Sequence, residues 1–555
     1  MMKRDSRWIE LNMDEIEDIL GRAREKPISD EEYKKLKAAM ETLAHFTEMV
    51  GNKDATINKL RKLLFGPSTE KIRDIVGKNT DSAGKDDASS GANPNETAKE
   101  SPWEKPKGHG RNGAAAYTGA NRVSVKHGSL KPGQRCPKCL KGKMYRCKEP
   151  AVLVRITGRA PIQATVYSME RLRCNLCGEV FTAEAPEGVG PSKWDEESKS
   201  MVGMLRYGAG FPFNRLSQLQ KNMGIPLPAS TQWAMVNEGV EAMEPAFEEL
   251  LRQGAQGEIL HNDDTSARIL EIVRKRRERE QSEEVDDPRE RTGMFTSGIV
   301  SISQERKIAL FFTGRQHAGE NLRDVLLKRA EGLRPPIQMC DGSSRNEPDL
   351  PEEFEVVLTN CNVHARRQFV DVAHQFPEEC RHVLEVFRDV YHNDKKARFQ
   401  GMTAEERQAF HKAESGPRMD HLKNWMAEQL DEKKVEPNSS LGKAIKYSQK
   451  RWDQLTRFLE VPGAPLDNNA AEQILKKAIL SRKNSYFYKT ARGAHVGDVY
   501  MSLIHTAELA KENPFDYLTQ LQKHSKEVKI NPSQWMPWNY RETIRRIETA
   551  KVSQA

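Results

Sequence analysis

Residues 257–369 alternate between strand and helix patterns, and this alternation restricts the fold more than any other feature of the sequence. The segments "GEILHNDDTSARIL", "TGMFTSGIVSIS" and "KIALFFTG" are rich in β-branched and aromatic residues and predict three strands. A helix pattern, "HAGENLRDVLLKRAEGL", is followed by a strand in "PPIQMCDGSS" and a strand-to-helix turn in "FEVVLTNCNVHARRQF". We therefore expect a mixed α/β sheet rather than a β-sandwich. The charged segment between the first two strands, "EIVRKRREREQSEEVDDPRERTG", is most simply a solvated hairpin tip or loop.

Three carboxylates stand at the ends of these elements. The first strand carries Asp263 and Asp264, the fourth is followed by Asp341, and Glu472 is the only acid between residues 472 and 493, in a basic helix pattern. Three such carboxylates can hold two Mg²⁺ or Mn²⁺ ions about 3.5 to 4 Å apart, which supports displacement at a phosphodiester. Strand alternation sends Asp263 and Asp264 to opposite faces, so one of them joins the site, and periodicity does not say which. Taken singly, each Asp is more simply a strand-end or turn residue.

Two C-x2-C pairs flank strand-like sequence between residues 126 and 190. The first pair is Cys136 and Cys139, and the second is Cys174 and Cys177. Four thiolates bind zinc tetrahedrally, and the metal replaces a hydrophobic core that so small a module cannot build. We predict a zinc ribbon with one structural Zn²⁺; the alternative is four free cysteines that pack as small apolar side chains.

Residues 191–255 predict a helix-turn-helix region. The segment "RLSQLQKNMGIPLPASTQWAMVNEGVEAM" contains a helix, a turn through Gly224 and Pro226, and a second helix that begins at Ser230 or Thr231. The second helix of such a pair can enter a major groove, although helical hairpins are common in other proteins. The candidate DNA contacts are Arg215 and Gln232 in this region and Lys476, Lys477, Arg482 and Lys483 after Glu472.

The remaining segments complete a multidomain α/β chain of 555 residues. Residues 1–70 are helical, as a short coiled coil or a pair of amphipathic helices, and 71–125 form a disordered linker with few apolar residues. A charged helical insertion, about 370–460, interrupts a catalytic domain at 256–500, and 501–555 form a helical tail. The formal charge of +8 mildly favours an anionic partner. The absence of a long apolar run predicts a cytoplasmic protein without membrane contact.

Several motifs together resemble transposases of the IS 66 group of bacterial insertion sequences. The motifs are "LHNDDT", "CDG", "NVHARRQF", "PLDNNAAEQ" and "SRKNSYF", in this order after the cysteine pairs. The resemblance implies a ribonuclease-H-like core, a leucine-zipper-like N-terminal segment, a zinc-binding domain and helix-turn-helix DNA binding. It also implies that Asp263, Asp341 and Glu472 are the catalytic acids. Cys361 and His364 match a C-x2-H pattern of related transposases and are expected to support the site, with a core histidine as the alternative reading of His364.

The implied function is that of a DNA transposase. Such a protein binds terminal inverted repeats, cleaves a strand and transfers it to target DNA, acts as a homo-oligomer, and works with companion proteins of the same element. The sequence departs from the family pattern at Gln473, at Asn362 and in "DGSSRN", which lacks the usual tyrosine. Two other readings stay open: a zinc-containing DNA-binding protein, including a catalytically lapsed transposase, and a ribonuclease-H-like nuclease without strand transfer.

Overall fold

The computed structural model describes residues 192–281, 291–304 and 306–554, with shorter stretches between residues 29 and 189. The chain divides into two compact units, one formed by Thr80–Pro161 and the other by Met1–Asn79 with Ile162–Ala555. The predicted N-terminal coiled coil and linker lie almost wholly outside the described residues. The elements that follow belong to the larger unit, from Ile162 onward.

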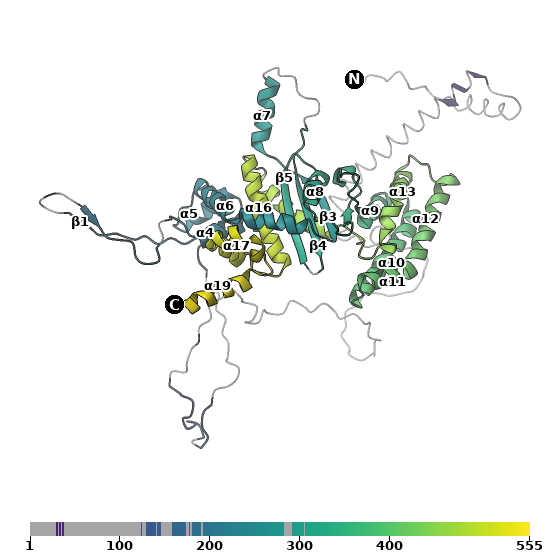
Figure 1. Ribbon diagram of the computed structural model, residues 1–555. Helices are drawn as coiled ribbons and strands as arrows, with labels where there is room; N and C mark the ends of the chain where they lie inside the picture. The colour runs from purple at the N-terminus through teal and green to yellow at the C-terminus, as the bar shows by residue number, and fades with distance from the viewer. Residues whose placement is uncertain are drawn as a thin grey trace, which may run out of the picture. The chain divides into compact units, whose positions relative to one another are not determined.

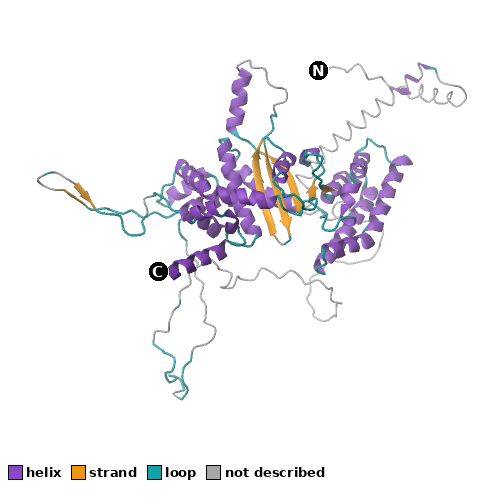
Figure 2. Cartoon of the chain, in the orientation of Figure 1, coloured by secondary structure: helices purple, strands orange, loops and turns teal. Residues whose placement is uncertain are grey.

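A five-stranded mixed sheet forms the centre of this unit (Figure 1, Figure 2). Its strands in chain order are β3 (Ile259–Ser266), β4 (Phe295–Ser303), β5 (Arg306–Gly314), β6 (Ile337–Cys340) and β7 (Val357–Asn360). The pairs β3–β4 and β4–β5 are antiparallel, whereas β3–β6 and β6–β7 are parallel. The predicted mixed α/β sheet is confirmed, with the strands in the segments that the sequence patterns indicate. In spatial order the strands are β5, β4, β3, β6 and β7.

Helix α16 (Ala491–Leu509) covers the edge of the sheet at β5. Its side chains accept hydrogen bonds from backbone N–H groups of β5 that would otherwise be free to pair with another strand. Four residues of a helix advance about 6 Å, and two residues of a strand advance about 6.6 Å. Every fourth side chain of α16 therefore meets every second backbone N–H of β5. The three pairs are Asp498 with Thr313 at 2.7 Å, Ser502 with Phe311 at 3.0 Å, and Thr506 with Ala309 at 3.1 Å.

A helical layer packs around α16 and shares its hydrophobic core. Two glycines allow close approach to Tyr500: a Cβ at Gly203 would lie 2.2 Å from its ring, and one at Gly239 would lie 2.5 Å from its hydroxyl. The predicted domain boundary at residue 500 therefore falls inside a buried helix. The helices are α4 (Glu196–Gly203), α5 (Phe213–Asn222), α6 (Ala229–Gly254), α17 (Pro514–Lys523) and α18 (Ser525–Ile530), followed by α19 (Tyr540–Gln554).

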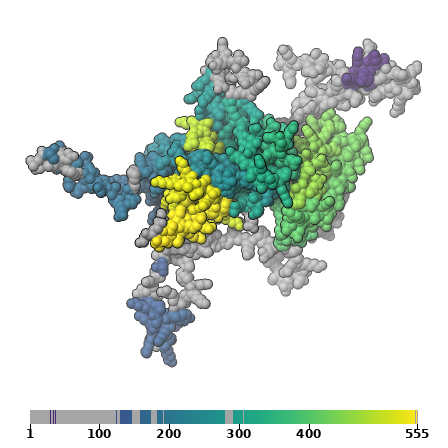
Figure 3. Space-filling view, viewed as in Figure 1, coloured from purple at the N-terminus to yellow at the C-terminus, as the bar shows by residue number. Residues whose placement is uncertain are grey.

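Helices occupy the stretch of about 370–460, called here the helical insertion, and they have a hydrophobic core of their own. Figure 1 shows its helices beside the sheet, and Figure 3 shows its surface in green. Phe369, Phe387 and Leu441 are among its buried side chains. Within it, the buried Asp394 pairs with Arg398 and Arg407. The helices are α9 (Asn362–Val372), α10 (Pro377–Phe399), α11 (Ala404–Glu414), α12 (Gly416–Asp431), α13 (Ser440–Lys450) and α14 (Trp452–Thr456).

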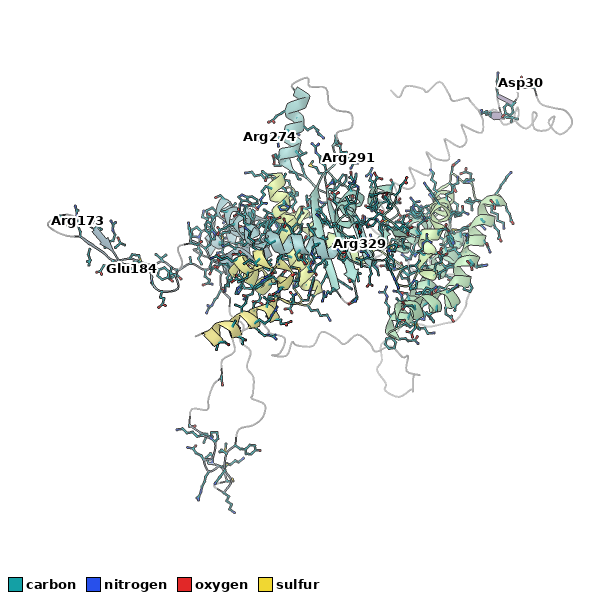
Figure 4. The ribbon with its side chains drawn as sticks, in the orientation of Figure 1. Asp30, Arg173, Glu184, Arg274, Arg291 and Arg329 are labelled. Carbon is teal, nitrogen blue, oxygen red and sulfur yellow. The ribbon has the colours of Figure 1, made fainter. Side chains whose placement is uncertain are left out.

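The first half of the charged segment after β3, as far as Gln281, is a helix, so reading this half as a hairpin tip or loop was wrong, and residues 282–290 lie outside the described part of the chain. Helix α7 (Leu270–Gln281) follows β3 directly, and Figure 4 shows Arg274 on it. Ion pairs one turn apart, Glu271 with Lys275 at 2.8 Å and Arg274 with Glu278 at 3.4 Å, stabilise a helix that has almost no apolar face. Sequence periodicity missed it because such pairs replace the hydrophobic stripe that usually marks a helix.

Candidate active site

Asp263 and Asp341 lie side by side on neighbouring parallel strands. His261 of β3 pairs with Met339 of β6, so two residues further along each strand Asp263 stands opposite Asp341. The side chain of Asn346 joins them, because its Nδ2 donates to Asp341 Oδ1 at 2.8 Å and to Asp263 Oδ1 at 3.3 Å. The two carboxylates therefore face one small region at the end of the parallel strands.

The electrostatics of this pair favour a bound cation. Burial and the neighbouring charge of Asp341 raise the pKa of Asp263 to about 7, against hydrogen bonds from the Asp264 N–H and from Asn346. Two anions that share one amide donor repel each other, and a divalent cation between them would remove that repulsion.

Asp264 has a different partner on another element. Its Oδ2 lies 2.8 Å from Nδ1 of His317, the residue before helix α8 (Ala318–Leu326). The ring of His317 packs on Phe295 with 4.0 Å between ring centres. Two adjacent carboxylates of β3 therefore point to separate surroundings, as the pleat of a strand requires.

The loop after β6 is held by the helical insertion. Tyr447 of α13 donates from its hydroxyl to the Asp341 carbonyl at 2.8 Å, and the Arg451 guanidinium donates to the Gly342 carbonyl at 2.8 Å. Gly342 has φ of +78°, and a Cβ there would lie 2.6 Å from Arg451 Nε. A glycine after Asp341 thus meets both a left-handed backbone and a close contact. The insertion positions Asp341 although it lies about a hundred residues away in the sequence.

Helix α15 (Asn469–Ser485) carries Glu472 in its first turn, and the buried Asn468 ties that turn to β3. The side chain of Asn468 donates to the Asn262 carbonyl at 3.0 Å, and its Oδ1 lies 3.2 Å from His261 Nδ1. Burial lowers the pKa of His261 to about 4, so the ring is neutral and its Nδ1–H donates. The Glu472 N–H in turn donates to the Asn468 carbonyl. Glu472 is therefore linked through Asn468 to Asn262, the residue before Asp263 on β3.

Close packing of α15 on the sheet fixes the direction of the helix. Gly298 of β4 pairs with Asp263, and a Cβ at Gly298 would lie 3.0 Å from the side chain of Leu475. Leu475 is about one helical turn after Glu472. The first turn of α15 therefore lies against the strand pair that carries Asp263.

Glu472 also meets the two residues expected to support it. The ligand atoms of Cys361, His364 and Glu472 all lie within 4.8 Å of one another, and His364 Nδ1 is 3.9 Å from Glu472 Oε1. Both of those atoms are buried, and neither has a hydrogen-bond partner in the described part of the chain. Burial raises the pKa of the Cys361 thiol to about 11, and its Sγ accepts from the Asn468 N–H at 3.3 Å. A thiol and an imidazole thus stand on one side of Glu472, and the two aspartates lie near the start of its helix.

Three basic residues of α15 are exposed, and a fourth contacts β3. Lys476, Lys477 and Lys483 are exposed, and Lys477 lies 3.8 Å from Glu508. Arg482 points back to β3, where it donates to Thr265 Oγ1 at 3.1 Å and to Ser266. The exposed lysines form a positive helix face that continues from the site.

The predicted DNA contact at Gln232 was wrong. Its side chain is fully buried, and Nε2 donates to the carbonyls of Phe213 and Leu227, which joins α5 to α6. Arg215 is exposed on α5. The helix, turn and second helix are present, but α6 begins at Ala229 without a side-chain cap and buries much of its length in the core.

The described cysteines of the two pairs, Cys136, Cys139 and Cys177, lie in two separate turns. In the unit Thr80–Pro161, the Gly142 N–H donates to Cys139 Sγ at 3.5 Å, and the pKa of Cys139 is lowered by backbone hydrogen bonds from Gly142 and Lys141 and by Cys136. In the larger unit, Cys177 is exposed between β1 (Arg171–Arg173) and β2 (Val180–Thr182), which pair antiparallel. Cys174 lies outside the described residues. Backbone donors around the Cys139 thiol suit a thiolate, which is the form of cysteine that binds a metal.

Sequence reasoning did not identify Asn346, Asn468 or Tyr447 as residues of the site. Asn468 belongs to the "DNN" run, and a buried asparagine just before a helix was the one signal that could have been followed. No helix in the described part of the chain is long and apolar enough to cross a membrane.

Comparison with known proteins gives the family. The sequence pattern described as "Transposase IS66 family" matches residues 192–496, which include all three acids. The uncharacterized protein y4jD of Sinorhizobium fredii is 26% identical over 432 residues, covering 74% of this chain and 79% of that protein. The uncharacterized protein y4hP of the same organism is 23% identical over 421 residues, covering 71% and 70%. Because the match spans more than half of its residues, the chain belongs to the IS66 family of transposases.

Proposed function

We propose that the protein is a DDE transposase with a ribonuclease-H-like core and the catalytic acids Asp263, Asp341 and Glu472. The observation that carries this proposal is the pairing of Asp263 with Asp341 across parallel strands, beside the helix that carries Glu472. The strand order supports the core type, because three antiparallel strands are followed by two strands parallel to the first. Membership of the family supports the reaction class.

The acids fit Mg²⁺ or Mn²⁺ as the proposed metal. Carboxylate oxygens are hard ligands, which these ions prefer. Burial and the charge of Asp341 together raise the pKa of Asp263, and the buried Glu472 Oε1 has no hydrogen-bond partner among the described residues. Both observations support a cation here. When bound, two such ions would stabilise the attacking and leaving oxygens of an in-line displacement at phosphorus.

The residues around the acids hold them in place. Asn346 keeps the two aspartates together, Tyr447 fixes the backbone of the second, and Asn468 ties the start of α15 to β3. Such preorganisation matters because small displacements of catalytic groups cost large factors in rate. We assign Cys361 and His364 to the support of Glu472, and the exposed lysines of α15 to DNA phosphates.

Both proposed chemical steps are displacements at phosphorus. In the first, a water oxygen bonds to the phosphorus at an end of the element, and the bond to the 3′ oxygen breaks and leaves a 3′-hydroxyl. In the second, that hydroxyl bonds to a phosphorus of target DNA and displaces the oxygen of the neighbouring nucleotide. One site can serve both steps because the geometry is the same.

The proposed partners and setting follow from this reaction. The DNA partners are the terminal inverted repeats and the target, with binding through the helix-turn-helix region and a ribbon that holds one zinc ion. We also propose a homo-oligomer that works in the cytoplasm with companion proteins of the same element.

The proposal is tested with the full-length protein, Mg²⁺ and a labelled duplex taken from the DNA that flanks the reading frame. A transposase should nick this duplex and join the new 3′ end to a second DNA. Nicking without joined product would favour a nuclease. Binding in Ca²⁺ without nicking in Mg²⁺ would favour a DNA-binding protein. A protein that neither binds nor nicks the duplex would contradict the proposal.

A further inference from the structure

A cleft lined by three arginines lies between the end of β3 and the end of α15. It is a shallow cleft open to solvent, and no acidic side chain lines it among the described residues. We call it the arginine cleft. Its main groups are Arg206, Arg268, Arg482, Thr265, Ser485 and Tyr486.

Arg206 brings a buried positive charge to the cleft. The residue is 6% exposed, and its guanidinium donates to Ser481 Oγ at 3.2 Å. Its other neighbours are the rings of Tyr207 and Phe213, 5.2 and 5.3 Å from the guanidinium carbon. Among the described residues Arg206 forms no ion pair, although the charges of Arg206 and of the buried Asp498 both act on the neighbouring Tyr207. A buried unpaired charge is unfavourable unless an anion joins it.

A second group in the cleft also lacks a partner. Ser485 Oγ is buried, and in the described part of the chain it has no hydrogen-bond partner. Arg482 already donates to Thr265, and Arg268 is exposed at the rim. Guanidinium groups and a free hydroxyl without acids are the donors that a phosphate oxygen needs.

Aromatic side chains stand at the mouth of the cleft. Tyr486 ends α15 with φ of +63°, a left-handed conformation that is unfavourable for tyrosine, and it is 70% exposed. Phe487, the next residue, is 43% exposed. Exposed rings beside arginines suit an unpaired nucleobase, which stacks on such a surface.

The cleft lies along the path from the proposed active site. Thr265 follows Asp263 by two residues on the same face of β3, roughly 7 Å along the strand. Arg482 is ten residues after Glu472 on the same helix, about 15 Å away. One DNA strand could therefore occupy both places.

We propose that the arginine cleft binds a phosphodiester group next to the cleaved one, and that Tyr486 stacks on the unpaired base of that nucleotide. The identity of the polymer as DNA rests on the proposed function. The cleft would thereby separate the strand end from its partner strand and hold it near the acids.

The test uses the full-length protein in Ca²⁺ with two duplexes, one blunt and one with a short single-stranded end that carries 2-aminopurine. Wild-type protein should quench 2-aminopurine and bind the single-stranded end more tightly than the blunt one. Tyr486→Gly should lose the quenching and weaken binding to that end about tenfold, with unchanged binding to the blunt duplex. Its melting temperature should not fall, because glycine relieves the left-handed strain.

Matched variants separate binding from folding. Lys433→Gly makes the same backbone change at an exposed residue with φ of +60° in the helical insertion, and it should leave quenching intact. Arg206→Met should weaken binding to the single-stranded end without lowering the melting temperature, since it removes an unpaired buried charge.

Three results would overturn the proposed role of the arginine cleft. They are a wild-type protein that binds the duplex but quenches nothing, a Tyr486→Gly variant that quenches like wild type, and an Arg206→Met variant that melts lower while binding normally. A wild-type protein that binds neither duplex would overturn the proposed function and this inference with it.

Discussion

Asp498 of α16 provides a test of how the edge of the sheet is held. Burial raises the pKa of its carboxyl from 3.8 to about 7, against hydrogen bonds from Thr313 and the charge of His495. A raised pKa means that the native state binds the proton more strongly than the unfolded chain does. The resulting stability is fully present below about pH 4 and is lost as the pH rises through 7. About three pH units at about 1.4 kcal/mol each make this loss about 4 kcal/mol.

The substitution Asp498→Asn should remove this pH dependence. The asparagine oxygen can still accept from the Thr313 N–H, and its amide can donate to Thr313 Oγ1, as the protonated carboxyl does. At pH 5, about 1.2 pH units above the ordinary pKa of 3.8, wild type has already lost about 1.7 kcal/mol, so the variant should melt roughly 2 to 4 °C higher. At pH 8 it should melt roughly 5 to 10 °C higher, because wild type has lost most of the 4 kcal/mol by then.

The measurement is a series of melting curves of the full-length protein between pH 5 and 8. The buried Asp394 is the control with the opposite sign. Burial alone would raise its pKa, but a hydrogen bond from His411 and the charges of Arg407 and Arg398 hold the pKa below its ordinary value. Asp394→Asn should therefore lower the melting temperature at pH 8. A pH profile of Asp498→Asn that parallels wild type, or a lower melting temperature throughout, would refute the reasoning.

Three further predictions follow from contacts outside α16. Asn468→Ala should destabilise the protein by about 1 to 3 kcal/mol in denaturant melts, because it leaves the polar groups of β3 unpaired; an unchanged midpoint would contradict the anchoring role. Replacing Lys476 and Lys477 by Gln should weaken binding to any duplex and flatten its salt dependence, and an unchanged salt slope would indicate a merely solvated helix face. Purified protein should hold about one zinc per chain, measured by atomic absorption, and Cys174→Ser should lower that content; full occupancy in the variant would remove the ribbon.

The strands were predictable because their signal is local. β-branched residues and turn residues mark β3 to β7 within short windows, so the mixed sheet and the order of the acids along the chain follow from the sequence. The register that sets Asp263 beside Asp341 was not readable, because it depends on how β3 and β6 align across the sheet.

The supporting residues were not predictable because their contacts are not local. Tyr447 reaches Asp341 from the helical insertion, and Asn468 reaches Asn262 from the loop before α15. Neither contact leaves a periodic pattern. Gln232 shows the converse error, since a polar residue at the start of a helix suggested DNA contact, while the buried side chain donates to the carbonyls of Phe213 and Leu227 and so joins α5 to α6.

The central claim is that Asp263, Asp341 and Glu472 act as one metal-dependent site. The most direct measurement is Mg²⁺-dependent nicking of a duplex from the end of the element, with binding followed separately in Ca²⁺. Glu472→Gln, Asp263→Asn and Asp341→Asn should each bind normally and lose nicking by orders of magnitude, with double variants little worse than single ones. Asp264→Asn should retain most of the activity, because that carboxylate is engaged with His317. Undiminished nicking by Glu472→Gln, or equal losses in Asp264→Asn and Asp263→Asn, would contradict the claim.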